Sequence, residues 1–213
     1  MEERVAYALK NFFTDKFTYE ANQLFYELLE TDKYGKSKLL VNVSGSENIC
    51  VKNFDDTSKW GIINGNKKLS LNKCVDHFIF QKNSEGFWEL HVFEMKTTVG
   101  FRTWQNIQYK MRPSYLRIKA LAIYLGIPIT DANITVYTTY EQDKFTTSQP
   151  YLPKLGYRVF DVKSEEWDAD CIRVPMIVSE DNPFDFKTFI PLHHKKIKMQ
   201  RSNDDILEGE ISL

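Results

Sequence analysis

The sequence is short of the residues that build disulfide or zinc frameworks. Its three cysteines, Cys50, Cys74 and Cys171, are odd in number, lie far apart and form no CxxC pair. Both kinds of framework need cysteines that are paired or closely spaced. We therefore expect neither a zinc site nor a disulfide, and we expect a protein of the reducing cytoplasm.

Long apolar runs and a strong net charge are also missing. No apolar run approaches the roughly 20 residues of a membrane-spanning helix, and Met1 to Arg4 lack the basic-then-apolar pattern of a signal peptide. The formal net charge is −1 at pH 7. We expect no membrane partner, and any contact with nucleic acid has to come from local clusters of charge.

The composition that remains is typical of one globular domain spanning 1–213. The chain has 213 residues, of which 30 are aromatic (15 Phe, 11 Tyr and 4 Trp) and only 9 are glycine. The order of expected elements favours an α/β (α+β) fold with a mixed central β-sheet flanked by helices. These elements are a helix over 19–31, paired strands over 38–43 and 48–54, strands over 74–80 and 87–96, a helix over 103–125, and a strand over 132–140.

The last third of the chain has a weaker pattern. We expect a C-terminal elaboration over about 150–200, with short strands at 158–162 and 171–178. The acidic segment from Asn203 to Leu213 is predicted to be a frayed tail. The core of the domain is therefore expected at about 20–140.

The strand over 87–96 carries an unusual pair of charges. Glu94 and Lys96 are two residues apart, so their side chains leave the strand on the same face. That face also carries Leu90 and Val92, although a solvated pair usually lies on a polar face. On the preceding strand Asp76 likewise shares a face with apolar residues.

An antiparallel hairpin of these two strands would bring Asp76 beside Glu94. Two partly buried carboxylates repel each other, and a hard divalent cation such as Mg²⁺ or Mn²⁺ resolves that conflict. A lysine beside the cation, here Lys96, can stabilise an oxyanion or help to activate water. The chemistry that suits this group is metal-assisted attack of water on a phosphodiester.

The pattern of Asp76 followed on the next strand by Glu94-Met95-Lys96, and then by a helix, resembles the PD-(D/E)xK nuclease superfamily. That superfamily includes restriction endonucleases and RecB-type exonucleases, and the resemblance covers about residues 20–140. It implies a restriction-endonuclease-like fold and a catalytic role for Lys96. It also implies that Mg²⁺ or Mn²⁺ is held by Asp76, Glu94 and the backbone carbonyl of Met95.

The same resemblance suggests further site residues. RecB-like members carry a glutamine with a nearby tyrosine on the helix after the lysine strand, and Gln105, or Gln108 followed by Tyr109, matches that pattern. Many members also use a glutamate on the first helix, for which Glu20 and Glu27 are both candidates. The sequence departs from the family in lacking a proline before Asp76, and its C-terminal third matches no family pattern.

The segment from Val99 to Thr130 contains five basic residues and no acidic one. Phosphate contact is a natural use for such a helix, although a merely solvated face is the alternative. The residues expected to contact nucleic acid are Gln105, Arg102, Arg112, Lys110 and Lys119.

Taken together, these patterns predict a Mg²⁺- or Mn²⁺-dependent nuclease that hydrolyses phosphodiester bonds of nucleic acid, with DNA favoured over RNA. A homodimer would be compatible with that activity. The alternative is a catalytically inactive module of the same fold that binds nucleic acid or a protein partner, in which Glu94 and Lys96 are only a structural ion pair.

Overall fold

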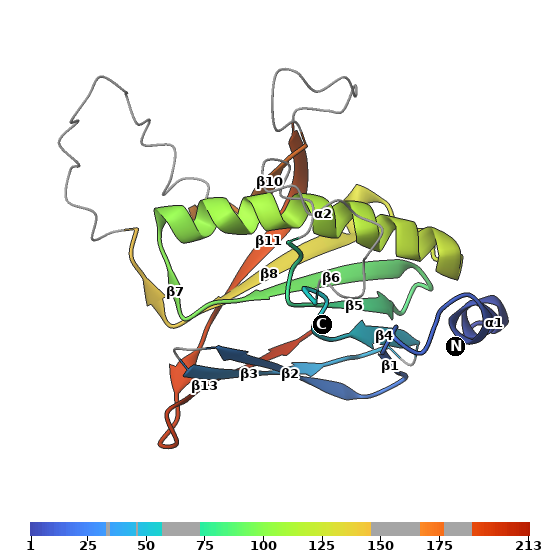
Figure 1. Ribbon diagram of the computed structural model, residues 1–213, viewed down its shortest axis with the longest axis horizontal. Coiled ribbons are helices and arrows are strands. Elements are labelled where there is room, and N and C mark those ends of the chain that lie inside the picture. The colour runs from blue at the N-terminus through green and yellow to red at the C-terminus, as the bar shows by residue number, and fades with distance from the viewer. Residues whose placement is uncertain (33–34, 46, 57–72, 146–166, 177–188) are drawn as a thin grey trace.

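A seven-stranded mixed sheet, hereafter the large sheet, forms the centre of the protein (Figure 1). The computed structural model describes residues 1–32, 35–45, 47–56, 73–145, 167–176 and 189–213. In spatial order the strands are β1 (Glu20–Ala21), β4 (Asn48–Val51), β5 (His77–Lys82), β6 (Trp88–Met95), β8 (Ile134–Tyr140), β11 (Phe189–Lys198) and β10 (Cys171–Pro175). The β6–β8 and β8–β11 pairs are parallel, and the others are antiparallel. The predicted mixed α+β class is confirmed.

A second, four-stranded sheet, hereafter the small sheet, lies against one face of the large sheet, and helix α2 crosses the other face (Figure 1). The small sheet has the order β12 (Gln200–Arg201), β13 (Ile206–Ser212), β3 (Gly35–Asn42) and β2 (Phe25–Asp32). The other elements are α1 (Glu3–Asn11), α2 (Phe101–Leu125), the 3₁₀ turn η2 (Asp131–Asn133), and a short parallel pair, β7 (Thr98–Val99) with β9 (Gln142–Asp143).

The two faces of β6 point into two different hydrophobic cores. Leu90 and Val92 face the core between the large sheet and α2, whereas Phe93 and Met95 face the core between the two sheets. Strands buried on both faces are apolar on both faces, as the sequence predicted for this strand. The charged side chain of Glu94 therefore leaves β6 on the helix-covered face.

The helix predicted over 19–31 is wrong, because this segment forms β1 and β2. Tyr26 and Leu28 are buried between the sheets, and Phe25 and Leu29 point the other way and are exposed. Apolar residues in this segment fall on both faces of a strand as well as on one side of a helix, and pairing with β3 decides in favour of the strand. As a result, one face of the large sheet is covered by a second sheet and not by helices.

The strands predicted at 38–43 and 48–54 exist, but they do not pair with each other. β3 belongs to the small sheet and β4 to the large one, so the chain crosses between sheets after Asn42. Gly45 lies in this crossing, where a Cβ would clash with the carbonyl oxygen of Lys82. A glycine therefore lets the crossing pass close to the end of β5.

The C-terminal residues complete both sheets. β11 pairs in parallel with β8, and β13 pairs in parallel with β3, so the frayed tail predicted from Asn203 to Leu213 is wrong. The strand predicted at 171–178 corresponds to β10, and the one predicted at 158–162 lies outside the described residues.

The long helix predicted over 103–125 is confirmed as α2, which runs through Pro113 as one element. It ends at Gly126, whose positive φ of 69° is the left-handed conformation that glycine adopts readily. No helix in the described ranges has the length and hydrophobicity to cross a membrane.

Candidate active site

The structure brings the two predicted carboxylates together at one end of the β5–β6 hairpin. Asp76 immediately precedes β5, and the pairing of His77 with Phe93 places Asp76 opposite Glu94. Asp76 is 2% exposed and Glu94 is fully buried. Two ionisable groups with so little access to water need partners of opposite charge.

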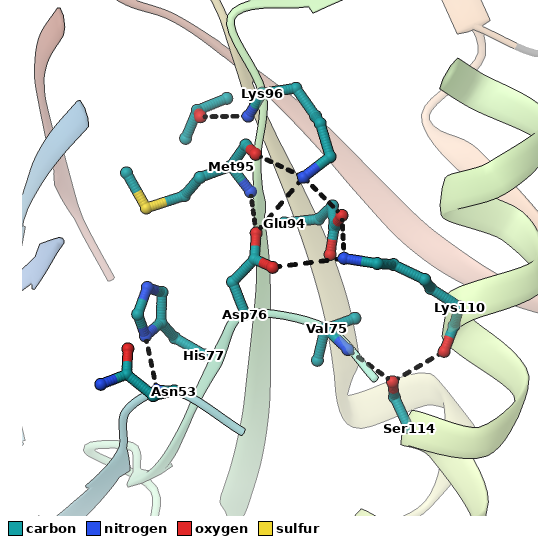
Figure 2. A network of polar contacts seen from close by, with 10 residues as sticks. Asn53, Val75, Asp76, His77, Glu94, Met95, Lys96, Lys110 and Ser114 are labelled. Atoms are coloured by element: carbon teal, nitrogen blue, oxygen red, sulfur yellow. Dashed lines mark hydrogen bonds and ion pairs between the residues drawn. The ribbon is translucent and has the colours of Figure 1, made fainter. Parts of the chain in front are cut away.

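Two lysines from different elements supply those partners (Figure 2). The Nζ of Lys96 lies 2.7 Å from Oε1 of Glu94, 3.6 Å from Oδ2 of Asp76 and 2.6 Å from the carbonyl oxygen of Met95. The Nζ of Lys110, which reaches down from α2, lies 2.7 Å from the same Oε1 and 3.3 Å from Oδ1 of Asp76. Each ammonium group therefore spans both carboxylates.

Lys110 was expected to contact phosphate from an exposed helix face, and the structure instead places it inside the carboxylate cluster. It follows Ile107 by three residues and precedes Ser114 by four, and both of these are buried. Residues at this spacing share one side of a helix. The sequence therefore contained the signal that Lys110 faces the sheet.

Backbone and hydroxyl groups fix the position of Asp76 (Figure 2). Its Oδ2 accepts a hydrogen bond of 2.7 Å from the backbone N–H of Met95. The neighbouring N–H of Val75 donates to Oγ of Ser114 at 2.9 Å, and that hydroxyl donates to the carbonyl oxygen of Lys110 at 2.7 Å. Ser114 thus ties the residue before Asp76 to the helix that carries Lys110.

The environment shifts the pKa values of the two carboxyl groups in opposite directions. Burial would raise the pKa of Asp76, but Lys96, Lys110 and the N–H of Met95 together hold it below its usual value. For Glu94, burial and the charge of Asp76 outweigh the two lysines and raise its pKa. Paired acids whose pKa values are pushed apart are typical of functional sites, although structural ion-pair networks also produce them.

The donor atoms at this cluster fit a hard divalent cation. The Oε2 of Glu94 is buried and has no hydrogen-bond partner among the residues that the structure describes. The other carboxylate oxygen of Glu94, one of Asp76 and the carbonyl oxygen of Met95 already surround the ammonium group of Lys96, so oxygens from all three residues lie close together. No cluster of three His, Cys, Asp or Glu side chains suited to a metal occurs in the described part of the chain. Two carboxylates are enough for Mg²⁺, which keeps several water ligands.

A cavity of about 260 Å³ borders the cluster between β6 and the first turns of α2. Three lysines and three uncharged polar side chains line it, so the cavity is suited to an anion. The lining residues are Lys73, Glu94, Lys96, Thr103, Asn106, Ile107, Tyr109 and Lys110.

The glutamines predicted to act on α2 do not line this cavity. Gln105 is exposed and Gln108 is partly buried, and the helix presents Asn106 and Tyr109 to the cavity in their place. Tyr109, which the sequence pattern paired with Gln108, is the one member of that motif at the site.

Of the three remaining predicted nucleic-acid contacts, Arg112 is buried, whereas Arg102 and Lys119 are not. Arg112 is 2% exposed, and its guanidinium nitrogens find no hydrogen-bond partner within the described ranges, so it offers no surface for phosphate. Lys119 donates to the carbonyl oxygen of Ile129 at 2.6 Å, away from the cluster. Arg102 is exposed in the first turn of α2.

The glutamates predicted to assist from a first helix are strand residues. Glu27 on β2 pairs with Lys38 at 2.7 Å, and Glu20 on β1 pairs with Lys52 at 2.6 Å. Neither glutamate is a member of the carboxylate cluster.

Glu30 and Asp55 are acidic neighbours of Asp76 that the sequence reading missed. Burial and the charge of Asp76 raise the pKa of Glu30 to about 7, and the same two causes raise the pKa of Asp55. If 19–31 is read as a strand, Glu30 falls on the inward face with Tyr26 and Leu28. The helix interpretation placed it on the opposite, solvent side.

The comparisons with known proteins give no related site that could be used to interpret this one. No family model, no curated protein and no solved structure matches the chain. Its chemistry has to be inferred from the geometry of its own residues.

Proposed function

We propose that the chain is a divalent-metal-dependent nuclease that hydrolyses phosphodiester bonds of nucleic acid, with DNA as the favoured substrate. One observation carries the proposal: two buried carboxylates from adjacent strands, Asp76 and Glu94, lie together with Lys96 and the carbonyl of Met95 beside a cavity lined by lysines. Oxygen ligands for a cation and a positive charge for a phosphate thus meet at one place.

The proposal gives each group a distinct task. Asp76, Glu94 and the carbonyl of Met95 would hold Mg²⁺ or Mn²⁺. When bound, such a cation polarises a phosphate oxygen and lowers the pKa of a coordinated water. Lys96 keeps its ammonium group at the edge of the cavity, where it would stabilise negative charge that develops on the phosphate.

The raised pKa of Lys96 supports that task. Burial would lower this pKa, but Glu94 and Asp76 raise it above the usual lysine value. Without a bound cation Lys96 is therefore charged at neutral pH, which suits it to electrostatic stabilisation and not to the role of a general base.

One observation favours the alternative of a binding module that does not cut. Lys96 and Lys110 already balance the charges of Asp76 and Glu94, so the group could be a closed ion-pair cluster. Such clusters can fix a fold without taking part in chemistry. A cleavage assay separates the two functions.

The assay offers single- and double-stranded DNA and RNA to the purified protein with Mg²⁺ or with Mn²⁺. We expect cleavage of at least one substrate, and its loss by a factor of at least about 100 in Asp76→Asn, Glu94→Gln and Lys96→Ala. Lys38→Met is the matched control, because Lys38 pairs with Glu27 on the small sheet. An uncut panel, or a Lys96→Ala protein that cuts as well as wild type, would contradict the proposal.

A further inference from the structure

Lys110 is the member of the cluster that belongs to the helix and not to the hairpin. Its ammonium group contacts Oε1 of Glu94 at 2.7 Å and Oδ1 of Asp76 at 3.3 Å. They belong to the two carboxylates that a divalent cation would bind, and Oε2 of Glu94 is the neighbour of the Oε1 that Lys110 contacts. A cation and an ammonium group at the same two carboxylates repel each other strongly, because little water screens them there.

The side chain of Lys110 has somewhere else to go. It lines the cavity beside the cluster and is 21% exposed, whereas both carboxylates are almost fully buried. A lysine stem is flexible, so the ammonium group can turn toward the cavity while the helix stays in place. The hydroxyl of Ser114 accepts the N–H of Val75 and donates to the carbonyl oxygen of Lys110, so this turn of the helix is tied to the segment before β5.

Lys96 also lines the cavity, but its ammonium group has one contact that Lys110 lacks. It follows Met95 directly, and its Nζ also donates to the carbonyl oxygen of Met95 at 2.6 Å. Among the described residues, the ammonium group of Lys110 contacts only the two carboxylates, so a cation that binds both of them competes for all of its partners.

We propose that Lys110 is a displaceable counter-cation: it neutralises Asp76 and Glu94 until a divalent cation binds, and the cation then releases it to contact a phosphate in the adjoining cavity. The inference rests on the cation site of the proposed function and adds to it a residue that couples metal binding to substrate binding. Before the metal binds, Lys110 prevents repulsion between the two carboxylates; afterwards its charge faces the substrate.

Mn²⁺ binding without any nucleic acid tests the competition directly. Electron paramagnetic resonance reports free Mn²⁺ during a titration of the wild-type protein, Lys110→Met and Lys110→Arg. Lys110→Met should bind Mn²⁺ about tenfold more tightly than wild type, a typical size for coupling between two ligands. Lys110→Arg, which keeps the charge, should stay close to wild type. Lys119→Met is the control, because that lysine of the same helix bonds to Ile129.

Magnesium binding to the unmodified protein provides a second test that does not depend on a variant folding. A Mg²⁺ titration followed by NMR should shift the ¹⁵Nζ signal of Lys110 more than that of Lys119. The inference is overturned if Lys110→Met binds Mn²⁺ no more tightly than wild type, or if the Lys110 signal does not respond to Mg²⁺. Tighter Mn²⁺ binding by Lys110→Met with an uncut substrate panel would leave the inference standing and remove the nuclease proposal.

Discussion

At the scale of single residues, Asp76 and Glu94 illustrate how one strand end can shift the pKa values of two acids in opposite directions. Asp76 accepts the N–H of Met95 and contacts both lysines, so its charged form is favoured. Glu94 is fully buried, and its Oε2 has no partner within the described ranges. In the proposed function, a cation at Oε2 would supply the missing interaction.

Replacement of Glu94 therefore has a specific expected result. Glu94→Gln keeps the shape of the side chain and removes the charge, so Mn²⁺ binding should weaken by at least about 100-fold. Mn²⁺ titration followed by electron paramagnetic resonance measures this change, with Glu89→Gln on the same strand as control. Equal affinities of Glu94→Gln and wild type would exclude Glu94 as a ligand.

Glu30 gives a prediction about pH and stability. Its pKa is about 7 in the folded protein and about 4.3 in an unfolded chain. Between these values the folded state binds a proton that the unfolded state does not, so this group lowers stability as pH rises from about 4.3 to 7. Glu30→Gln lacks this effect. Its Tm relative to wild type should therefore increase between pH 4 and pH 7 and level off above pH 7.

Thermal unfolding at pH 4, 5.5, 7 and 8 measures that difference. Glu27→Gln on the same strand is the control, because Glu27 is partly exposed and pairs with Lys38. A Tm difference between Glu30→Gln and wild type that is the same at every pH would show that Glu30 keeps an ordinary pKa.

The sequence predicted correctly how site residues are placed where that placement depends only on residues nearby in the chain. Glu94 and Lys96 share a face because strand side chains alternate, and Asp76 meets Glu94 because a short hairpin sets the register. Spacing within α2 indicates that Lys110 faces the sheet, but its contact with Asp76 and Glu94 depends on where α2 crosses the large sheet, which local spacing does not determine. Glu30 was hidden because its segment was assigned the wrong periodicity.

At the scale of elements, the contact between α2 and the start of β5 holds the site together. Ser114 accepts the N–H of Val75 and donates to the carbonyl oxygen of Lys110, so one hydroxyl joins the segment that carries Asp76 to the helix that carries Lys110. Val75 and Ser114 are both buried, so no water can replace the hydroxyl without a rearrangement.

Ser114→Ala should show the importance of this link. The variant leaves the buried N–H of Val75 without an acceptor, which costs about 1–3 kcal/mol of unfolding free energy. Because Asp76 is the next residue, Mn²⁺ binding should weaken as well. Urea unfolding and Mn²⁺ titration measure the two effects, and Ser212→Ala, at an exposed position on β13, is the control. Unchanged stability would show that this hydroxyl is not needed.

The elements that the sequence predicted correctly are those with an unambiguous pattern. α2 has a long apolar stripe and a glycine end, and β5 and β6 are apolar on both faces with a polar turn between them. The segment over 19–31 fitted both a helix and a strand, and its partner β3 selected the strand. Local propensity cannot decide such a case, since the deciding contacts are made with another part of the chain.

At the scale of the whole molecule, the C-terminal third adds strands to both sheets, including the large sheet that carries Glu94. β11 extends the large sheet beside β8, and β13 adds a strand to the small sheet beside β3. Parallel pairs of this kind join distant segments without a tight turn. This is the physical reason that the sequence suggested only a frayed tail.

Leu207 on β13 distinguishes a closing strand from a frayed tail. Its side chain is 2% exposed within the core between the two sheets. Leu207→Ala should therefore lower the unfolding free energy by about 2–5 kcal/mol, as for other buried leucines. Urea unfolding measures the change, and Glu208→Ala, at the neighbouring exposed position, should have little effect. A cost near zero for Leu207→Ala would mean that β13 is not part of the folded core.

The central question for the molecule is whether Asp76 and Glu94 form a cation site or a closed ion-pair cluster. Anomalous diffraction from crystals of the protein grown with Mn²⁺ answers it most directly. We expect one peak within about 2.0–2.2 Å of an oxygen of Asp76, an oxygen of Glu94 and the carbonyl oxygen of Met95, as for a hard six-coordinate cation. In the electron density of the same crystals, the side chain of Lys110 should point into the cavity. If no peak lies there, and Lys96 and Lys110 still span the two carboxylates, the cation site and the nuclease function built on it are contradicted.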